Sequence, residues 1–445
     1  MFLERIEAKG LAQFSYVLAS QGSAVIIDPR RDIDVYADLL AARGWKAVAI
    51  LETHIHADFA SGSRELAAAT GAPMYLSAHD EGETFHYAFP HRELRDGDEV
   101  HVGDLRIVAY HTPGHTPEHL SFLVFEKSRC GQPLALFSGD FVFVGSLGRP
   151  DLLGEDAKRL LAHQLYQSVH TRIASLPDFL LIYPGHGAGS LCGANLSDRP
   201  LTTLGYERFC NIFMTDQPEG SFVEQILSTV PEFPDYYRRM KALNSAGAPI
   251  LGKIPGDAEL DLPEFERLVA AGATVIDLRN PVAFGGGHIP GAMNIGAGGG
   301  FGLYAPWVVP PDAPVLFIGD SRNSTEEARR ALVRVGVDDL RGQLKGGYNA
   351  WAEAHLSIAT LPQIKLSELG SRTLLDVRNP AEFALNHAPG AISMPVGKLA
   401  ATLPILHTPL AVICGSGYRS SLVASLLKRA GIEDVANVTG GMASN

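Results

Sequence analysis

Three side chains that commonly bind metal ions lie within five residues of one another near the start of the chain. They are His54, His56 and Asp58, and they directly follow an apolar run at residues 47–51. A mixed set of imidazole and carboxylate groups suits zinc and iron without identifying the ion. Because the apolar run has the length of a buried strand, we expect a metal site at the end of a strand.

Similar residues follow three later apolar runs of the same kind. These residues are His115, Asp140 and His186. Because α/β proteins place their sites just beyond the carboxyl ends of strands, we expect these side chains to converge on one site. The short strands and amphipathic stretches around them predict an α/β fold.

Length, charge and cysteine spacing limit the class of protein. A chain of 445 residues is too long for one hydrophobic core, and its net charge of -12 argues against nucleic acid as a partner. No run of 18 apolar residues and no basic leader occurs, so we expect a cytoplasmic protein without a membrane anchor. The four cysteines form no CxxC pair, which argues against both a disulfide framework and a cysteine zinc site. Cys130 and Cys210 lack site-like neighbours, and we expect no chemical role for them.

The second half of the chain contains an internal repeat. Residues 275–292 match residues 374–391 at a constant separation of 99 positions, with an Asp-x-Arg-Asn-Pro motif in each copy. Each copy carries about a hundred residues of strand and helix signals, which is the size of a domain. We therefore expect three domains, at residues 1–245, 255–355 and 362–445.

Proline and glycine suggest less ordered stretches between these signals. The segment 217–252 is interpreted as a linker that contains a short helix at 236–243. Two glycine triplets, at 285–287 and 298–300, are interpreted as flexible loops, because neither lies between a strand and a helix as a nucleotide-binding loop does.

The ligand motifs of the first 245 residues resemble those of the metallo-β-lactamase superfamily. The motifs are HxHxD at 54–58, Gly-His-Thr at 114–116, Gly-Asp at 139–140 and Gly-His at 185–186. The resemblance implies an αββα sandwich. Two-zinc hydrolases of this superfamily usually continue the first motif with a histidine, where this chain has Phe59. An aromatic ring cannot bind the metal, so the sequence favours one metal ion over two.

Within this superfamily the domain is similar to the persulfide dioxygenases. A further match is Gly-Arg-Pro-Asp-Leu at residues 148–152. Carried over residue by residue, the iron ligands are His54, His115 and Asp140, and two imidazoles with one carboxylate form the ligand set of non-haem Fe(II) oxygenases. The resemblance implies mononuclear non-haem Fe(II), O₂ as co-substrate and a persulfide as substrate.

Five further residues are assigned to the surroundings of this centre. The resemblance places His56, Asp58 and His186 around the ligands or facing the substrate, where such groups orient ligands. Arg149 is a candidate to bind an anionic carboxylate of the substrate, with a helix-capping or surface role as the alternative. Cys192, six residues after His186, is assigned either to carrying sulfur in the iron pocket or to packing as a buried thiol.

A second chemical motif follows the apolar run at 411–413. Cys414 opens a loop before a helical pattern, and this position together with Arg419 lowers a thiol pKa and stabilises a bound anion. Residues 362–445 resemble the rhodanese family. The resemblance implies a persulfide on Cys414, catalysis by Cys414 and Arg419, and substrate binding by the rest of the loop. These loop residues are Gly415, Ser416, Gly417, Tyr418 and Ser420.

The first copy of the repeat lacks this cysteine. Its loop at 318–324 contains no thiol in either register, so we expect a rhodanese-like domain that orients its neighbours without covalent chemistry. Arg322 in this loop is either an anion-binding group or a solvated cation. In the second copy the chain ends at Asn445, soon after the Gly-Gly pair at 440–441, and we expect this to affect stability more than the loop.

These motifs predict one function and leave two alternatives. The prediction is a persulfide dioxygenase that also transfers sulfane sulfur, acting in sulfide detoxification on persulfide, thiosulfate and thiol substrates. One alternative is a zinc thioester hydrolase of the glyoxalase II type with an accessory sulfur carrier. The other is a carrier or sensor in which Cys414 holds a persulfide for a partner. The sequence leaves open the thiol, the direction of sulfur transfer and the oligomeric state, with a homo-oligomer among the options.

Overall fold

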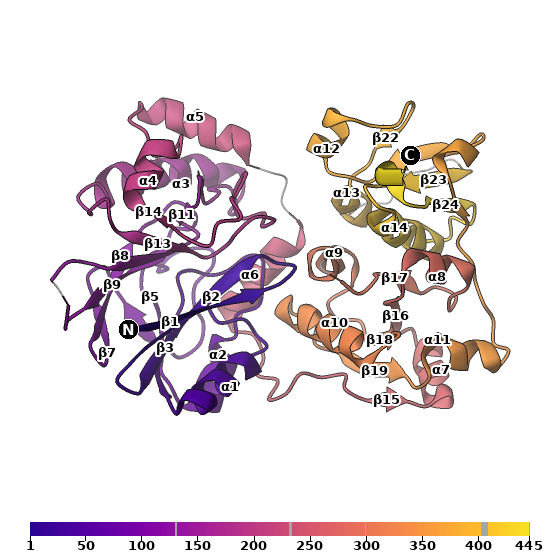
Figure 1. Ribbon diagram of the computed structural model, residues 1–445, viewed down its shortest axis with the longest axis horizontal. Helices are drawn as coiled ribbons and strands as arrows, with labels where there is room; N and C mark the ends of the chain where they lie inside the picture. Colours follow the sequence, from indigo (N-terminus) through magenta and orange to yellow (C-terminus); the bar gives the residue numbers. More distant parts are fainter. Residues whose placement is uncertain (130, 231–233, 299, 402–407, 445) are drawn as a thin grey trace. The chain divides into compact units, whose positions relative to one another are not determined.

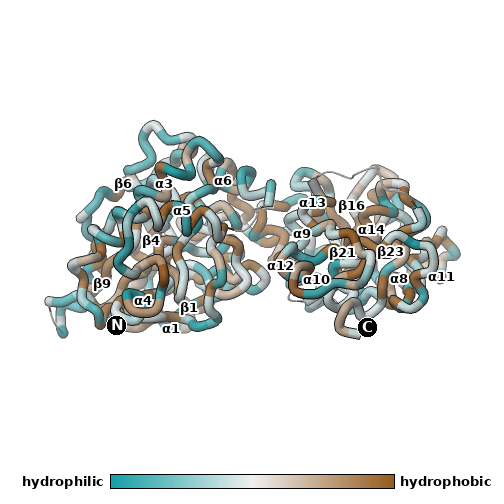
Figure 2. The backbone as a smooth tube through the Cα atoms, turned by 90° about the horizontal axis from the view of Figure 1, so that it is seen from above, coloured by the Kyte–Doolittle hydropathy of each residue, from teal (hydrophilic) through white to brown (hydrophobic). Residues whose placement is uncertain are grey.

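The computed structural model describes residues 1–445 apart from 130, 231–233, 299, 402–407 and 445. Cys130 and Asn445 therefore lie outside the described residues. The chain divides into two compact units, Met1–Gly252 with Arg334–Gly336 and Lys253–Val333 with Val337–Asn445 (Figure 1). Hydrophobic segments lie inside each unit, and hydrophilic segments lie mostly at its periphery (Figure 2).

Two six-stranded sheets pack face to face in the first unit. One sheet has the order β1 (Phe2–Ala8), β2 (Gln13–Ser20), β3 (Ser23–Ile27), β4 (Lys46–Leu51), β5 (Met74–Ser77) and β6 (Arg92–Leu94). The other has the order β14 (Thr202–Thr203), β13 (Leu181–Pro184), β10 (Ala135–Gly139), β9 (Leu120–Glu126), β8 (Leu105–His111) and β7 (Glu99–Val102). Alternate residues of both sheets, among them Tyr16, Ile107 and Phe137, form one buried cluster between them.

Helices cover the outer face of each sheet (Figure 1). α1 (Asp34–Arg43) and α2 (Ser63–Thr70) bury apolar side chains such as Tyr36 against the first sheet. α3 (Glu155–Gln167), α4 (Leu204–Cys210) and α5 (Glu219–Thr229) do the same against the second sheet, for example through Phe222. This order of layers confirms the predicted αββα sandwich.

The segment 217–252 belongs to the first unit. It contains α5 and α6 (Tyr236–Ala246), and α6 buries Tyr237, Met240 and Lys241. The helix predicted at 236–243 is confirmed. The linker interpretation is wrong, because one side of α6 is buried within the unit, whereas a helix in a solvated linker would bury none.

The second unit contains two five-stranded parallel sheets of matching order. The first copy of the repeat forms β15 (Glu259–Leu260), β19 (Leu340–Leu344), β18 (Val315–Ile318), β16 (Thr274–Asp277) and β17 (Met293–Asn294). The second copy forms β20 (Gln363–Ile364), β24 (Val435–Val438), β23 (Leu410–Ile413), β21 (Thr373–Asp376) and β22 (Ile392–Ser393). The registers also match, because Asp277 pairs with Ile318 as Asp376 pairs with Ile413.

Short helices flank both of these sheets. In the first copy they are α7 (Leu262–Ala270), α8 (Pro281–Gly286), α9 (Phe301–Val308), α10 (Arg322–Arg334) and α11 (Gly347–Glu353), and in the second α12 (Pro380–Leu385), α13 (Val396–Ala401) and α14 (Tyr418–Arg429). Gly285 and Gly286 lie within α8, so the flexible-loop interpretation is wrong for them. Gly299 lies outside the described residues. None of the helices in the described part of the chain is long and apolar enough to cross a lipid bilayer.

Candidate metal centre and sulfur-transfer loop

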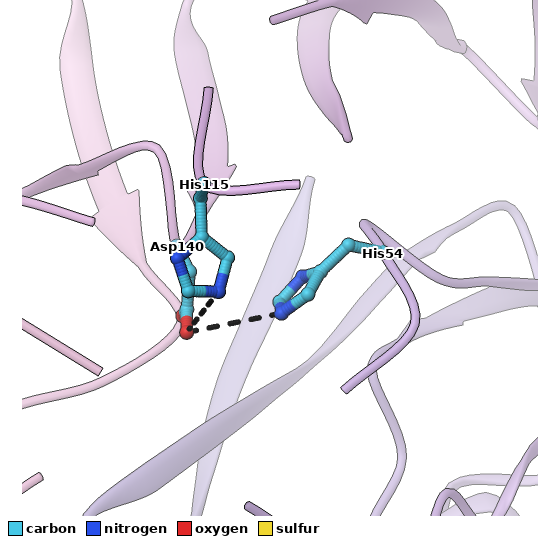
Figure 3. Close-up of side chains that lie close together, drawn as sticks. All are labelled: His54, His115 and Asp140. Carbon is cyan, nitrogen blue, oxygen red and sulfur yellow. Dashed lines mark ion pairs between the residues drawn. The ribbon is translucent and has the colours of Figure 1, made fainter. Parts of the chain in front are cut away.

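Three buried side chains from three strand ends converge in the first unit. His54 follows β4, His115 follows β8 and Asp140 follows β10, and one potential ligand atom from each lies within 4.8 Å of the others (Figure 3). The Oδ2 atom of Asp140 is 3.8 Å from Nε2 of His54 and 3.5 Å from Nε2 of His115. These are the three residues predicted to bind iron, and the fold brings them together.

The same three atoms lack hydrogen-bond partners among the described residues. Nε2 of His54, Nε2 of His115 and Oδ2 of Asp140 are all buried without a partner. An unsatisfied buried polar atom costs about 1–3 kcal/mol, so three of them at one point need a common partner. Burial first, and neighbouring histidines second, hold the pKa of His54 and His115 well below the usual value. Neutral imidazole is the form that binds a metal, so these residues fit a metal ion.

Hydrogen bonds behind the two histidines present the unpaired nitrogens to the centre. The Thr53 hydroxyl donates to Asp28 at 2.9 Å, so it accepts from Nδ1 of His54, also at 2.9 Å. Nδ1 of His115 donates to the carbonyl of Arg149 at 2.9 Å. Both rings therefore carry the proton on Nδ1 and direct the lone pair of Nε2 toward Asp140.

The His56 ring lies beside that of His54, with centroids 4.2 Å apart, but His56 is not one of the three grouped ligands. Its Nε2 atom lies 3.3 Å from Oδ1 of Asp28 and 4.0 Å from Oε2 of Glu52. Burial lowers the pKa of His56, but the two carboxylates more than offset this and raise it. The adjacent Phe59 ring is fully buried, with its centroid 4.4 Å from that of His56. The position that carries a histidine in two-zinc hydrolases thus holds a packed aromatic ring.

A second group of possible ligands, Asp58, His186 and Cys192, lies beside the first. His186 bridges two carboxylates, since Nδ1 is 2.7 Å from Oδ1 of Asp140 and Nε2 is 2.8 Å from Oδ2 of Asp58. Both ring nitrogens are therefore engaged, and the imidazole offers no free lone pair to an ion. The group of His54, His115 and Asp140 fits a metal better for this reason.

Cys192 is buried near these carboxylates. Burial, followed by the charges of Asp58 and Asp140, raises the pKa of the thiol well above its usual value. A neutral thiol is a weak nucleophile. The predicted sulfur-carrying role of Cys192 stays a prediction, and the structure adds that the thiol lies beside the candidate centre.

Arg149 is a buried side chain with several partners. Its Nε and Nη2 atoms donate to the two carboxylate oxygens of Asp151 at 2.7 and 2.8 Å, and Nη1 donates to the carbonyl of Leu191 at 2.9 Å. The surface alternative is wrong, because only 1% of the residue is exposed. Binding of a substrate carboxylate stays a prediction, and it requires these bonds to rearrange.

Three residues that hold the site were not predicted from the sequence. The His119 ring stacks on His54 at 5.2 Å, and its Nε2 accepts from the backbone N–H of Asp140 at 3.2 Å. From α6, Lys241 donates to the carbonyl of Ile55 at 2.8 Å, and Asn244 donates to backbone carbonyls of the same loop. His119 was detectable as a histidine four residues after His115, whereas the α6 residues lie more than 180 positions from the loop they hold.

The predicted sulfur-transfer loop joins β23 to α14 in the second copy. Cys414 is fully buried, and its Sγ accepts from the backbone N–H of Gly417 at 3.2 Å and from the Ser420 hydroxyl at 3.4 Å. The Arg419 guanidinium forms two hydrogen bonds with Glu382, at 2.6 and 2.8 Å. Two donors therefore contact the sulfur, and the charge of Arg419 is paired with that of Glu382. The other predicted loop residues lie between Cys414 and Arg419 in the chain and are Gly415, Ser416 and Tyr418.

In the first copy, Gly319 occupies the position of Cys414. The matched strand registers place Ile318 at the position of Ile413, and the next residue is Gly319, so the absence of a thiol is confirmed. A cavity of about 510 Å³ lies over this loop. Arg322 at its edge forms an ion pair with Glu259 at 3.2 Å, so the charge is already balanced.

Two family models match the chain. The model for the "Metallo-beta-lactamase superfamily" matches residues 8–186, and that for the "Rhodanese-like domain" matches 261–354 and 363–444. The crystal structure of a metallo-beta-lactamase from Staphylococcus aureus is similar at 34% identity and a TM-score of 0.69, covering 77% of this chain and 99% of that one.

Two curated relatives are similar to the first unit. A hydroxyacylglutathione hydrolase from Polaromonas sp. is 34% identical over 192 residues, which is 42% of this chain and 66% of the relative. The persulfide dioxygenase ETHE1, mitochondrial, from Bos taurus is 28% identical over 210 residues, 45% of this chain and 75% of the relative. The chain thus spans just under two thirds of the hydrolase, and the two relatives carry different activities.

Proposed function

The chain belongs to the metallo-β-lactamase superfamily and continues into two rhodanese-like domains, and we propose that it oxidises low-molecular-weight persulfides to sulfite and transfers sulfane sulfur through Cys414. The observation that carries the first activity is the set of three unpaired ligand atoms beside an engaged His186 and a buried Phe59. This arrangement favours one metal ion with open positions. Similarity to a persulfide dioxygenase supports the choice of reaction.

The expected oxidation consumes one persulfide, one O₂ and one water, and it yields sulfite, the thiol and two protons. When bound by His54, His115 and Asp140, an Fe(II) ion supplies open coordination positions and reactivity toward O₂. Thr53 and the Arg149 carbonyl hold the two imidazoles in the required tautomer. His186 is hydrogen-bonded to Oδ1 of Asp140, and the other oxygen, Oδ2, lies toward His54 and His115.

The sulfur transfer follows from the Cys414 loop. The Cys414 thiolate attacks the outer sulfur of thiosulfate, the S–S bond breaks, and its electron pair leaves with sulfite. The product is a persulfide on Cys414. An acceptor thiol then attacks the outer sulfur of this persulfide and removes it. Gly417 and Ser420 donate hydrogen bonds to the attacking sulfur and stabilise its charge. The reverse reaction consumes sulfite, the product of the proposed oxidation, and the two sites on one chain raise its local concentration.

Oxygen uptake tests the first activity. The full chain is reconstituted with iron and given glutathione persulfide, coenzyme A persulfide and bacillithiol persulfide in turn. We expect oxygen uptake with sulfite as product, its loss in His54→Ala, and its retention in Cys414→Ser. One tightly bound zinc and no oxygen uptake after iron reconstitution would contradict the proposal.

A zinc thioester hydrolase is the second candidate. One support is the 34% identity to a hydroxyacylglutathione hydrolase. The other is the second group of possible metal ligands, which consists of Asp58, His186 and Cys192. This function predicts zinc, and a water of lowered pKa as the nucleophile. Metal analysis together with hydrolysis of a hydroxyacyl glutathione thioester separates the two candidates. Turnover of the thioester by the zinc form, without oxygen uptake by the iron form, selects the hydrolase.

A further inference from the structure

The helix that follows the Cys414 loop packs against the edge of the first copy's sheet. β17 is the outermost strand of that sheet, so within the described part of the chain one of its sides is not paired with another strand. Such an edge is often covered by a helix, and here the backbone N–H of Asn294 in β17 donates to the Ser425 hydroxyl of α14 at 3.0 Å. The α14 residues that contact the first copy are spaced by three or four positions, as on one face of a helix, and are Tyr418, Ser421, Ser425 and Arg429.

The side chain of Asn294 connects this face of α14 to the framework of the first copy. Its Nδ2 atom donates to the carbonyls of Asp277 at 3.1 Å and Arg279 at 2.9 Å. Because these two bonds occupy the amide nitrogen, Oδ1 faces α14 and accepts from the Ser421 hydroxyl at 2.6 Å. Both side chains are buried. The second copy has Ser393 at the matching register, so the fold itself does not require an asparagine at this position.

The first copy also holds Tyr418, the first residue of α14. The Tyr418 hydroxyl donates to the carbonyl of Gly296 at 2.9 Å. Cβ atoms built on Gly296 and Gly300 would lie 3.3 and 3.0 Å from the Tyr418 ring, so glycine at these positions lets the ring lie close to the backbone. The bonds from Tyr418 and Ser421 together attach the first turn of α14 to the first copy.

The same turn of α14 carries the two donors to the reactive sulfur. The backbone N–H of Gly417 and the hydroxyl of Ser420 lie 3.2 and 3.4 Å from Sγ of Cys414. Each donor is directly followed in the chain by a side chain that is bound to the first copy. The beginning of the loop is held by its own copy, because the carbonyl of Cys414 accepts from the backbone N–H of Met442 at 2.8 Å. The end of the loop is held by the first copy.

We propose that Asn294 and Gly296 of the first copy are positioning residues for sulfur transfer at Cys414. By holding the first turn of α14, they keep the Gly417 and Ser420 donors at the sulfur while it attacks the sulfur donor. This inference rests on the proposed sulfurtransferase activity and leaves its covalent step unchanged. It gives the cysteine-free copy a part in the reaction without a covalent step of its own.

Ser421→Ala in the full chain tests the proposal, because it removes the bond to Asn294 and leaves Cys414 and its two donors in the sequence. Cys414 that forms a persulfide with thiosulfate is first titrated by mass spectrometry. We expect kcat for thiosulfate-to-thiol transfer, per titrated Cys414, to fall about tenfold, and KM for thiosulfate to stay within about twofold. Tyr418→Phe keeps the ring and removes only the bond to Gly296, so it should lower this kcat about fivefold.

Arg429→Ala is the matched control for both variants. Arg429 donates to the carbonyl of Gly291 at 3.1 Å, so this variant also loses a bond to the first copy, but at the other end of α14. Its kcat per titrated Cys414 should stay within about twofold of wild type. A variant that is only less stable would contain less titratable Cys414 and would keep the wild-type kcat per titrated site.

Hydrogen exchange gives a second readout that needs no turnover. Backbone amides 415–421, followed by mass spectrometry, should exchange about tenfold faster in Ser421→Ala than in wild type or Arg429→Ala. Unchanged kcat per site in Ser421→Ala, or in Tyr418→Phe if Ser421→Ala does not fold, overturns the positioning role, as does an equal fall in Arg429→Ala. Absence of transfer in the wild type instead contradicts the sulfurtransferase proposal. The exchange rates then decide the positioning separately, because equal rates in wild type and Ser421→Ala overturn it.

Discussion

The two copies of the repeat share the arrangement of their sheets and differ in the loop that carries Cys414 in the second copy. Both have the same order of parallel strands. Each also has a buried ion pair at the carboxyl end of β16 or β21, 2.5 Å between Arg279 and Asp277 and 2.7 Å between Arg378 and Asp376. These pairs hold the backbone that follows the strand. The framework therefore does not require the cysteine.

The loop after β18 and β23 carries the difference. Cys414 is replaced by Gly319, and Ser420, which donates to the thiol, is replaced by Thr325. A Cβ on Gly319 would lie 2.8 Å from the Thr325 hydroxyl, so the threonine takes the space that a cysteine side chain needs. The comparison teaches that the residues of this loop can change, the thiol and the arginine included, while the sheet and the ion pair stay.

Replacement of the reactive cysteine should have the largest effect. In Cys414→Ser we expect thiosulfate-to-thiol transfer to fall about 10³-fold or more, because the covalent carrier is lost. Persulfide-dependent oxygen uptake should persist, since its ligands lie in the first unit. Transfer is measured by sulfite release. Unchanged transfer would reject both the sulfurtransferase and the sulfur-carrier role of Cys414.

Disruption of the ion pairs should show that the framework is equivalent in the two copies. Asp277→Ala and Asp376→Ala each leave a buried arginine without its carboxylate, at a cost of about 3–5 kcal/mol. Differential scanning calorimetry should show a lower unfolding temperature for both variants. Asp257→Ala is the control, because its partner Lys253 is exposed and 3.8 Å away. A large loss in only one copy would contradict a common framework.

A buried histidine should make the first copy sensitive to acid. His288 stacks on Phe284, and burial lowers its pKa from 6.5 to about 4. Because the folded pKa lies below the unfolded one, the unfolded chain takes up the proton first as pH falls. The stability that the fold gains from keeping His288 neutral is thus fully present above pH 6.5 and is lost as the pH falls toward 4. At pH 5 the loss in the free energy of unfolding is about 2 kcal/mol.

Urea unfolding followed by Trp351 fluorescence measures this effect, since Trp351 is a buried residue of the first copy. His288→Gln should weaken the loss of stability between pH 7 and pH 5. His387→Gln is the matched control, because His387 occupies the equivalent position in the second copy but is exposed. The same pH dependence in wild type and His288→Gln would show that other groups cause it.

Restoration of the cysteine alone should have the smallest effect. In a Cys414→Ser background, Gly319→Cys should transfer no more sulfur than the background, because Thr325 crowds the new side chain. Adding Thr325→Ala removes the hydroxyl that crowds position 319 and should make room for the thiol, but it does not supply the arginine that the second copy has at position 419. Mass spectrometry after thiosulfate treatment measures a persulfide at position 319. Transfer by the single Gly319→Cys change would contradict the importance of its surroundings.

Much of the site could be predicted from local patterns. His54, His115 and Asp140 each lie a few residues beyond a strand, and strand ends meet in a sandwich, so spacing along the chain was sufficient to group them. The Cys414 loop was recognisable because strand, glycines, arginine and helix are contiguous. The repeat, and the absence of a thiol from its first copy, could also be read directly from the sequence.

Only the tertiary structure decided which of these groups are available for chemistry. His56 and His186 are ligand types in ligand motifs, but carboxylates distant in the sequence lie beside them: Asp28 is 3.3 Å from His56, and Asp140 is hydrogen-bonded to His186 at 2.7 Å. The side chain of Arg149 is held by its neighbours, while its carbonyl orients His115. The loop of metal ligands is held by α6, and the start of α14, next to the Cys414 loop, is held by Gly296 and Asn294 of the first copy. Hydrogen bonding depends on distance in space, and these partners come together only when the chain has folded.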